Sequence, residues 1–201
     1  QTCALPIFLA TLALAFFTSA LDVSARITPR SKKQDAADAD AFFATNGVAV
    51  LKIELSEAAV ASLKKNHRKN VSATIREGNK VYEDVALHIK GSAGSFRGFD
   101  DKPGLTLNFA SLEASDYFHG LRKFHLNNGA QDGTFISEMM CANLFRAAGV
   151  PASRATHAIV ELNGRKLGLF VLLEGMEKSF LGKHFKDPSG SLYGQSGGGD
   201  V

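Results

Sequence analysis

Cysteine and net charge are both scarce in this chain. Only Cys3 and Cys141 occur among its 201 residues. Cys141 would stand alone once an N-terminal leader is removed, which excludes an internal disulfide and suggests no thiol metal site. The net charge is only +3. A nucleic-acid-binding surface needs a concentrated basic patch, and the basic run at 64–69 is typical of the solvated last turn of a helix. We therefore expect no nucleic-acid partner.

A long hydrophobic run is also missing. Residues 7–17 are almost continuously apolar, but a helix that crosses a bilayer needs about 20 apolar residues. Small residues at 18–20 follow, as at the cleavage site of an export signal. We expect a signal peptide at 1–25, no stable membrane span after its cleavage, and an exported protein that is extracellular, periplasmic or on the cell surface. The absent initiator Met leaves open whether residues 1–7 are native.

The motifs of common hydrolases are missing as well. No Gly-x-Ser-x-Gly nucleophile elbow is present. The histidines show no metal-ligand spacing, and they are His67, His88, His119, His125, His157 and His184. These absences argue against a hydrolase. They leave open an enzyme of another class, or a secreted structural or binding module that uses its sheet as a coat- or carbohydrate-interaction surface.

What is present, after a polar linker at 26–46, is a series of strands with a few helices. Alternating and β-rich patterns predict strands at 48–55, 71–76, 80–90, 104–109 and 121–127. A hairpin of 155–162 and 166–173 across Asn163-Gly164 follows, and a further strand is expected to begin at 191–194. We expect helices at 56–66, 134–148 and 176–184. Ser56 and Asp132 are the expected N-caps of the first two, and Gly149 ends the second. The pattern is α+β, dominated by antiparallel sheet.

Glu138 stands out on the helix at 134–148. Helical spacing places it on one face with Phe135, Cys141 and Phe145. A carboxylate in an apolar stripe is costly unless a cation or hydrogen-bond donors meet it. Either a basic group lies opposite, or the glutamate reaches solvent or caps a neighbouring backbone.

A glycine-rich connection, 91–98, joins two predicted strands, with Lys102 just beyond it. Glycines let backbone N–H groups approach phosphate oxygens, and a lysine adds charge. No helix follows directly, which excludes a Walker A or Rossmann turn. A strand, a loop and a strand followed by a lysine is how protein kinases hold ATP, although a purely structural turn explains the glycines too.

The apolar segment 169–173 ends at Glu174-Gly175. An unalternating apolar run is typical of a strand that is covered on both faces. Free backbone N–H and C=O groups at the end of such a strand can form hydrogen bonds with the edge of an adenine ring. Taken alone, the pattern favours an ordinary strand end.

Together these segments resemble the CotH (spore-coat protein H) kinase family. The resemblance runs from about 85 to 194, with weaker support from 47, and it rests on the order of segments 102–109, 120–128, 131–151, 157–164, 168–174 and 190–193. It implies a partial CotH-kinase-like domain at 47–201. The implied fold is α+β, a mainly antiparallel sheet with one key helix, like the N-lobe of an atypical protein-kinase-like fold with the C-lobe truncated.

The resemblance also implies a chemistry. Such proteins transfer phosphate from ATP, with Mg²⁺, to Ser or Thr of secreted or surface proteins. By position, Lys102 would reach the phosphates and pair with Glu138, although Ser137 stands where many relatives carry an arginine. Gly91, Gly94 and Arg97 would lie near the phosphates, and Leu173, Glu174 and Gly175 would border the adenine. The catalytic and metal-binding aspartates of relatives would follow Tyr193, so we expect no catalytic or metal residue within this chain and no kinase activity from it alone.

Overall fold

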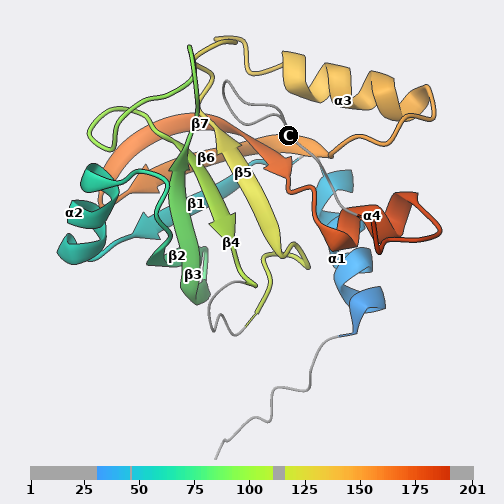
Figure 1. Cartoon of the computed structure of the whole chain (residues 1–201), viewed down its shortest axis with the longest axis horizontal. Coiled ribbons are helices and arrows are strands. Elements are labelled where there is room, and N and C mark those ends of the chain that lie inside the picture. Colours follow the sequence, from blue (N-terminus) through green and yellow to red (C-terminus); the bar gives the residue numbers. More distant parts are fainter. Residues whose placement is uncertain (1–30, 46, 111–115, 191–201) are drawn as a thin grey trace, which may run out of the picture.

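The computed structural model describes residues 31–45, 47–110 and 116–190. The expected signal peptide and the expected strand at 191–194 lie outside these ranges. The strands (Figure 1) are β1 (Ala49–Glu54), β2 (Val71–Glu77), β3 (Lys80–Lys90), β4 (Gly104–Asn108), β5 (Lys123–Asn127), β6 (Ala155–Leu162) and β7 (Arg165–Glu174). The helices are α1 (Lys32–Ala44), α2 (Glu57–Lys65), α3 (Ser137–Ala147) and α4 (Lys178–His184). None of these helices is long and apolar enough to cross a membrane.

The strands form a closed barrel in the order β1-β2-β3-β4-β5-β7-β6. Six neighbouring pairs in this order are antiparallel, including the hairpin of β6 and β7. The barrel closes where β1 runs parallel to β6, with Leu51 opposite Val160. Every strand therefore has two hydrogen-bonded neighbours, which leaves no open edge among the described strands.

The expected fold class is therefore wrong. We expected a mainly antiparallel sheet with one key helix, like the N-lobe of a kinase-like fold, whereas the structure is a closed, mixed seven-stranded barrel with four helices in the described residues. The reason is that alternation in a strand shows which face is buried, but not which distant strand occupies its edge. The parallel pairing of β1 with β6 joins segments that are far apart in the sequence.

The barrel interior is filled by side chains. Inward positions alternate with outward ones along the strands, as in the buried-exposed pattern of β1. Fully buried residues include Leu51, Ile75, Leu87, Leu105, Phe124, Val160 and Phe170. A small barrel packed in this way has no room for a ligand inside. A functional site must therefore lie on the outside or at an end of the barrel.

Helix α1 occupies most of the segment that we expected to be a polar linker. Ser31 caps it, with its Oγ accepting from the N–H of Gln34. Ala39 is buried, and the Phe42 ring packs edge-on against Phe118 of the core at 5.4 Å between centroids. The helix approaches Gly120 so closely that a Cβ there would overlap the Asp35 carbonyl oxygen. α1 is thus part of the folded unit.

Helix α3 begins later than the sequence predicted. Asp132 is not its N-cap residue, although its carboxylate accepts from the N–H of Thr134 in the preceding turn and from the N–H of Ser137, the first residue of the helix. Phe135 has a φ of +59°, which no helical residue adopts, and the N-cap is Ile136, without a side-chain bond. The expected end is confirmed, since Gly149 follows with a φ of +78°.

Candidate functional site

A cavity of about 200 Å³ lies beside the end of β3. It is bounded by β3 and β5, by the glycine-rich segment 91–98, by the loop after β5 and by the start of α3. Its lining includes Lys90, Gly91, Ser95, Gly104, Asn127, Asn128, Gln131, Asp132, Phe135 and Glu138. Two residues that the sequence predicted for a nucleotide site, Gly91 and Glu138, therefore meet at one place.

A lysine, an amide and a carboxylate form one network in this cavity. Lys90 Nζ donates to Asn127 Oδ1 at 2.6 Å. The Asn127 side chain in turn donates to both oxygens of Glu138, at 2.8 and 2.7 Å. Glu138 is thus met by hydrogen-bond donors, as its place on the helix requires. The cation that faces it is Lys90, one amide away.

Gly104 explains why Lys90 can reach across the sheet. In the register of the barrel, Gly104 of β4 pairs with Lys90 of β3. Since β4 separates β3 from β5, a side chain at this position would stand between Lys90 and Asn127. A Cβ on Gly104 would lie 3.3 Å from Lys90 Cγ, a closer contact than nearly all side chains make. The glycine therefore keeps the path of the lysine open.

Burial shapes the electrostatics of this network. It lowers the pKa of Lys90 below its usual value, Glu138 opposes that shift, and the charge of Lys123 adds to it. Lys90 contacts a neutral amide, and no carboxylate of the described residues forms an ion pair with it. Its ammonium is therefore a half-buried charge that an anion in the cavity would stabilise.

The glycine-rich segment is folded on itself next to the cavity. Asn128 holds it by donating to the carbonyls of Ser95, at 3.1 Å, and of Lys102, at 2.9 Å. Gly91 has a φ of +124°, and a Cβ there would come within 2.8 Å of Phe96 Cα, so tight backbone packing requires this glycine. Gly94 also has a positive φ, and a Cβ there would meet the Gln131 side chain.

Arg97 contacts residues that are close to it in the sequence. Its guanidinium donates to the Phe96 carbonyl at 2.7 Å and lies 3.6 Å from Asp101. It is absent from the lining of the cavity. The structure therefore gives Arg97 a local role, and its expected place near a phosphate stays a prediction.

Lys102 does not form the expected ion pair with Glu138. Its Nζ donates to the Leu169 carbonyl at 2.7 Å and lies over the rings of Phe135 and Phe170, at 4.6 and 4.7 Å from their centroids. Burial lowers its pKa. Lys102 thus fastens the segment before β4 to β7, and its expected contact with phosphate stays a prediction.

The end of β7 is tied to the barrel. Glu174 is buried, and its carboxylate accepts from the backbone N–H, Nε and Nη2 of Arg154. The N–H of Glu174 donates to the Arg154 carbonyl, and that of Gly175 donates to the Lys123 carbonyl. Leu173 pairs with His125 across the ladder. The N–H groups of Glu174 and Gly175 are therefore engaged, and the adenine-bordering role of 173–175 stays a prediction.

The outer face of β3 and β5 carries polar residues that sequence reasoning missed. They continue from the cavity along the strands as His88, Lys90, Lys123, His125 and Asn127. Burial, with the charges of Lys90 and Lys123, lowers the pKa of His125 to about 3, and its Nδ1 lies 2.9 Å from Thr106 Oγ1. The sequence feature that could have predicted this face is the alternation, which places basic residues at every second position of the two strands.

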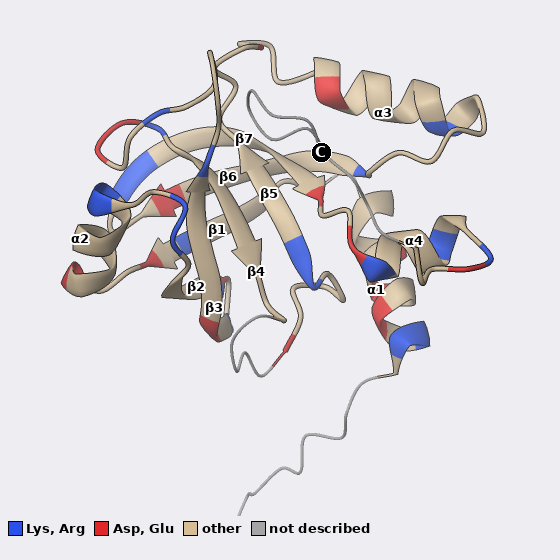
Figure 2. Cartoon of the chain, in the orientation of Figure 1, with Lys and Arg blue, Asp and Glu red and all other residues tan. Residues whose placement is uncertain are grey.

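Helix α3 carries one charged residue near each of its ends. Its two charged residues are Glu138, near its start, and Arg146, near its end, and Figure 2 shows them as a red and a blue band. Ala142 is the residue of α3 that is buried. In the described ranges, no group of three or more His, Cys, Asp or Glu residues is placed to hold a metal ion.

Comparison with known proteins identifies the family of this sequence. A search of curated proteins found no match. The sequence model of the family described as CotH kinase protein matches residues 87–197, more than half of the chain. The matched segment contains Lys90, Asn127 and Glu138, the whole network of the cavity. The chain therefore belongs to the CotH kinase protein family.

Proposed function

We propose that this protein is an exported CotH-like kinase that transfers phosphate from ATP to Ser or Thr of secreted or surface proteins. In this proposal the cavity beside Lys90 receives phosphate groups of the nucleotide. The observation that carries it is the network of Lys90, Asn127 and Glu138 next to the glycine-rich segment. Phosphoryl transfer depends mainly on positioning and on neutralising charge, and this network provides both.

The residues fit a phosphate in three respects. Lys90 has donors beyond the one it gives to Asn127. Glu138 and Asn127 hold the lysine in place without neutralising it by direct contact. Lys123 extends the positive charge along β5 from the cavity, beside the neutral ring of His125. A cavity of about 200 Å³ suits a phosphate group, and the rest of a nucleotide would lie along the outer face of the strands.

Mg²⁺ finds no comparable fit in the described residues. The carboxylate of Glu138 is engaged with Asn127, and that of Asp132 with Thr134 and Ser137. The metal-binding and acceptor-orienting aspartates remain a prediction for the sequence beyond Tyr193, and so does the absence of kinase activity from this chain alone.

Two lysine variants test the proposal. Binding of a fluorescent ATP analogue to the 201-residue chain is measured for Lys90→Met and for Lys102→Met, two substitutions that remove the same charge. We expect Lys90→Met to weaken binding by about tenfold or more, the worth of one charge-assisted hydrogen bond, and Lys102→Met to leave the affinity unchanged. Circular dichroism checks that both variants fold. The reverse pattern would refute the role of Lys90 and favour the assignment made from the sequence.

A secreted structural or binding module without catalysis remains the second candidate. This alternative requires Lys102 and Glu138 to lie far apart. Among the described residues no ion pair joins them, because Lys102 donates to the Leu169 carbonyl and Glu138 accepts from Asn127. It also requires that no cleft opens beside Leu173, and Leu173 does not line the cavity beside Lys90. Failure of the wild-type chain to bind the nucleotide analogue at all would favour the module.

A further inference from the structure

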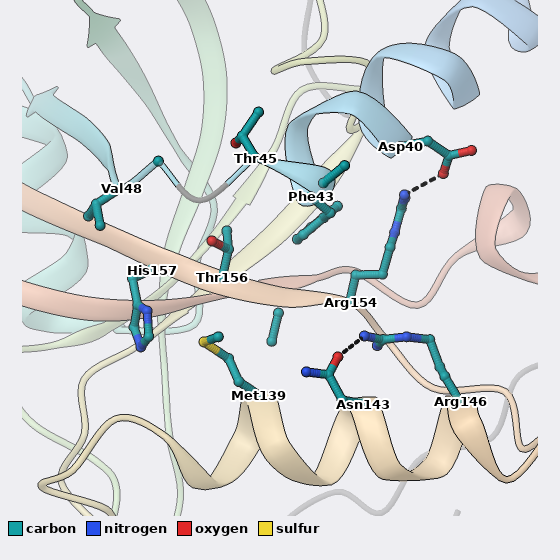
Figure 3. Close-up of a pocket in the computed structure, with 13 residues that line it drawn as sticks. Asp40, Phe43, Thr45, Val48, Met139, Asn143, Arg146, Arg154, Thr156 and His157 are labelled. Atoms are coloured by element: carbon teal, nitrogen blue, oxygen red, sulfur yellow. Dashed lines mark hydrogen bonds and ion pairs between the residues drawn. The ribbon is translucent and has the colours of Figure 1, made fainter.

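A second and larger cavity, of about 490 Å³, lies farther along α3. Its walls come from the end of α1, from Gly47 and Val48, from α3 and from the start of β6. Figure 3 shows Met139 and Asn143 pointing from α3 toward β6, with the Arg146 side chain bent back to Asn143. Its volume lies within the range of about 300–1,000 Å³ that is usual for pockets that bind small molecules.

The two arginines of this cavity differ in their partners. Arg154 is neutralised by two carboxylates, those of Glu174 at 2.5 Å and Asp40 at 2.6 Å. Arg146 donates to the Ser153 carbonyl at 2.8 Å and to Asn143 Oδ1 at 2.5 Å, both of which are uncharged. No carboxylate among the described residues lies within ion-pair distance of Arg146.

Arg146 therefore offers an uncompensated charge to the cavity. A guanidinium has five N–H donors, and the two bonds leave the others for a planar acceptor such as a carboxylate. The rest of the wall is mixed: Phe43, Val48, Met139 and Ala155 present apolar surface, and polar groups come from Asp40, Thr45, Asn143, Arg154, Thr156 and His157. A suitable ligand combines one anionic group with an apolar body.

We propose that this cavity binds a small organic acid. Its carboxylate pairs with Arg146, and its apolar body lies against Phe43 and Met139. The competing explanation is that Arg146 only ties α3 to the segment before β6 through Ser153. That role needs the guanidinium but no ligand, so a binding measurement separates the two. The proposal does not depend on nucleotide binding, because none of the lining residues belongs to the cavity beside Lys90.

Calorimetric titration of the full chain with N-acetyl-phenylalanine, and with its uncharged amide, provides the test. We expect saturable binding of the acid, and binding of the amide that is weaker by about tenfold or more, because the charge-assisted bond is lost. Arg146→Met should weaken binding of the acid by a similar factor. Arg76→Met is the matched control, because Arg76 pairs with Glu54 on the surface of β2 and is absent from the cavity.

A second variant guards against misfolding of Arg146→Met. Met139→Trp fills the cavity without removing the guanidinium, and it should abolish binding of the acid while the Arg76→Met control binds normally. An acid that does not saturate at millimolar concentration would overturn the proposal. So would an acid that binds no better than its amide, or one whose binding survives Met139→Trp.

Discussion

Replacing Glu174 by glutamine removes one charge from the most buried ion pair described. Arg154 donates to this carboxylate from its backbone N–H, at 3.1 Å, from Nε, at 2.9 Å, and from Nη2, at 2.5 Å. The two side chains are only 13% and 10% exposed. Breaking a buried pair costs about 3–5 kcal/mol, and a glutamine that keeps part of the hydrogen bonding recovers some of it, so we expect a loss of about 3 kcal/mol.

Asp40 provides a matched control, because it contacts the same guanidinium from the solvent side. Its carboxylate lies 2.6 Å from Arg154 Nη1, but its side chain is 58% exposed. Asp40→Asn should therefore cost about 0.5 kcal/mol, as expected for exposed ion pairs. Urea denaturation followed by circular dichroism measures both. With a slope of about 2 kcal/mol per molar urea, the midpoint should fall by about 1.5 M for Glu174→Gln and by about 0.3 M for Asp40→Asn.

The outcome also bears on the adenine-bordering role that the sequence suggested for Glu174. Equal midpoint shifts for the two variants would refute the argument from burial. A Glu174→Gln variant that keeps its stability but loses affinity for the nucleotide analogue would show that the carboxylate faces a ligand and does not serve the barrel.

Two further predictions concern stability. The pKa of His125 is about 3 in the folded chain, against an ordinary 6.5. The folded state therefore keeps the ring neutral, whereas the unfolded chain takes up a proton below pH 6.5. The free energy of unfolding is unaffected above pH 6.5 and falls as the pH drops below that value. Between pH 7 and pH 5 the wild type should lose about 2 kcal/mol more stability than His125→Gln, measured by urea denaturation at each pH, and parallel losses would contradict this. Gly120→Ala should release α1 and speed trypsin cleavage after Lys33, because a Cβ there overlaps Asp35. Gly78→Ala, with positive φ but open space, should leave cleavage unchanged, and equal rates would contradict the packing argument.

Local chemistry in the sequence was a reliable guide to local structure. Asn163 and Gly164 adopt φ values of +46° and +77° and form the predicted turn between β6 and β7. Ser56 caps α2 as expected, with Oγ accepting from the N–H of Ala59. In these places the residue type determines the backbone conformation within a few positions, so no distant contact is needed to predict it.

Features that depend on distant contacts were not predictable in the same way. Lys90 and Lys102 flank the glycine-rich segment on its two sides, and Lys102 alone was expected from the sequence to be the partner of Glu138. The choice depends on strand register, which places Gly104 beside Lys90 and Asn127 within its reach. The helix α1 was missed for a similar reason, because its sequence is polar and its attachment rests on a few contacts, such as that of Phe42 with the core.

The way the barrel closes sets the smallest piece of this chain that can remain soluble. The family-matched segment begins at residue 87, inside β3, whereas closure requires β1 and β2, which precede it. A chain trimmed to the matched segment would lose the neighbour of β3 on one side and that of β6 on the other. Unpaired strand edges recruit other chains and promote aggregation. The unit defined by sequence similarity is therefore smaller than the unit that folds.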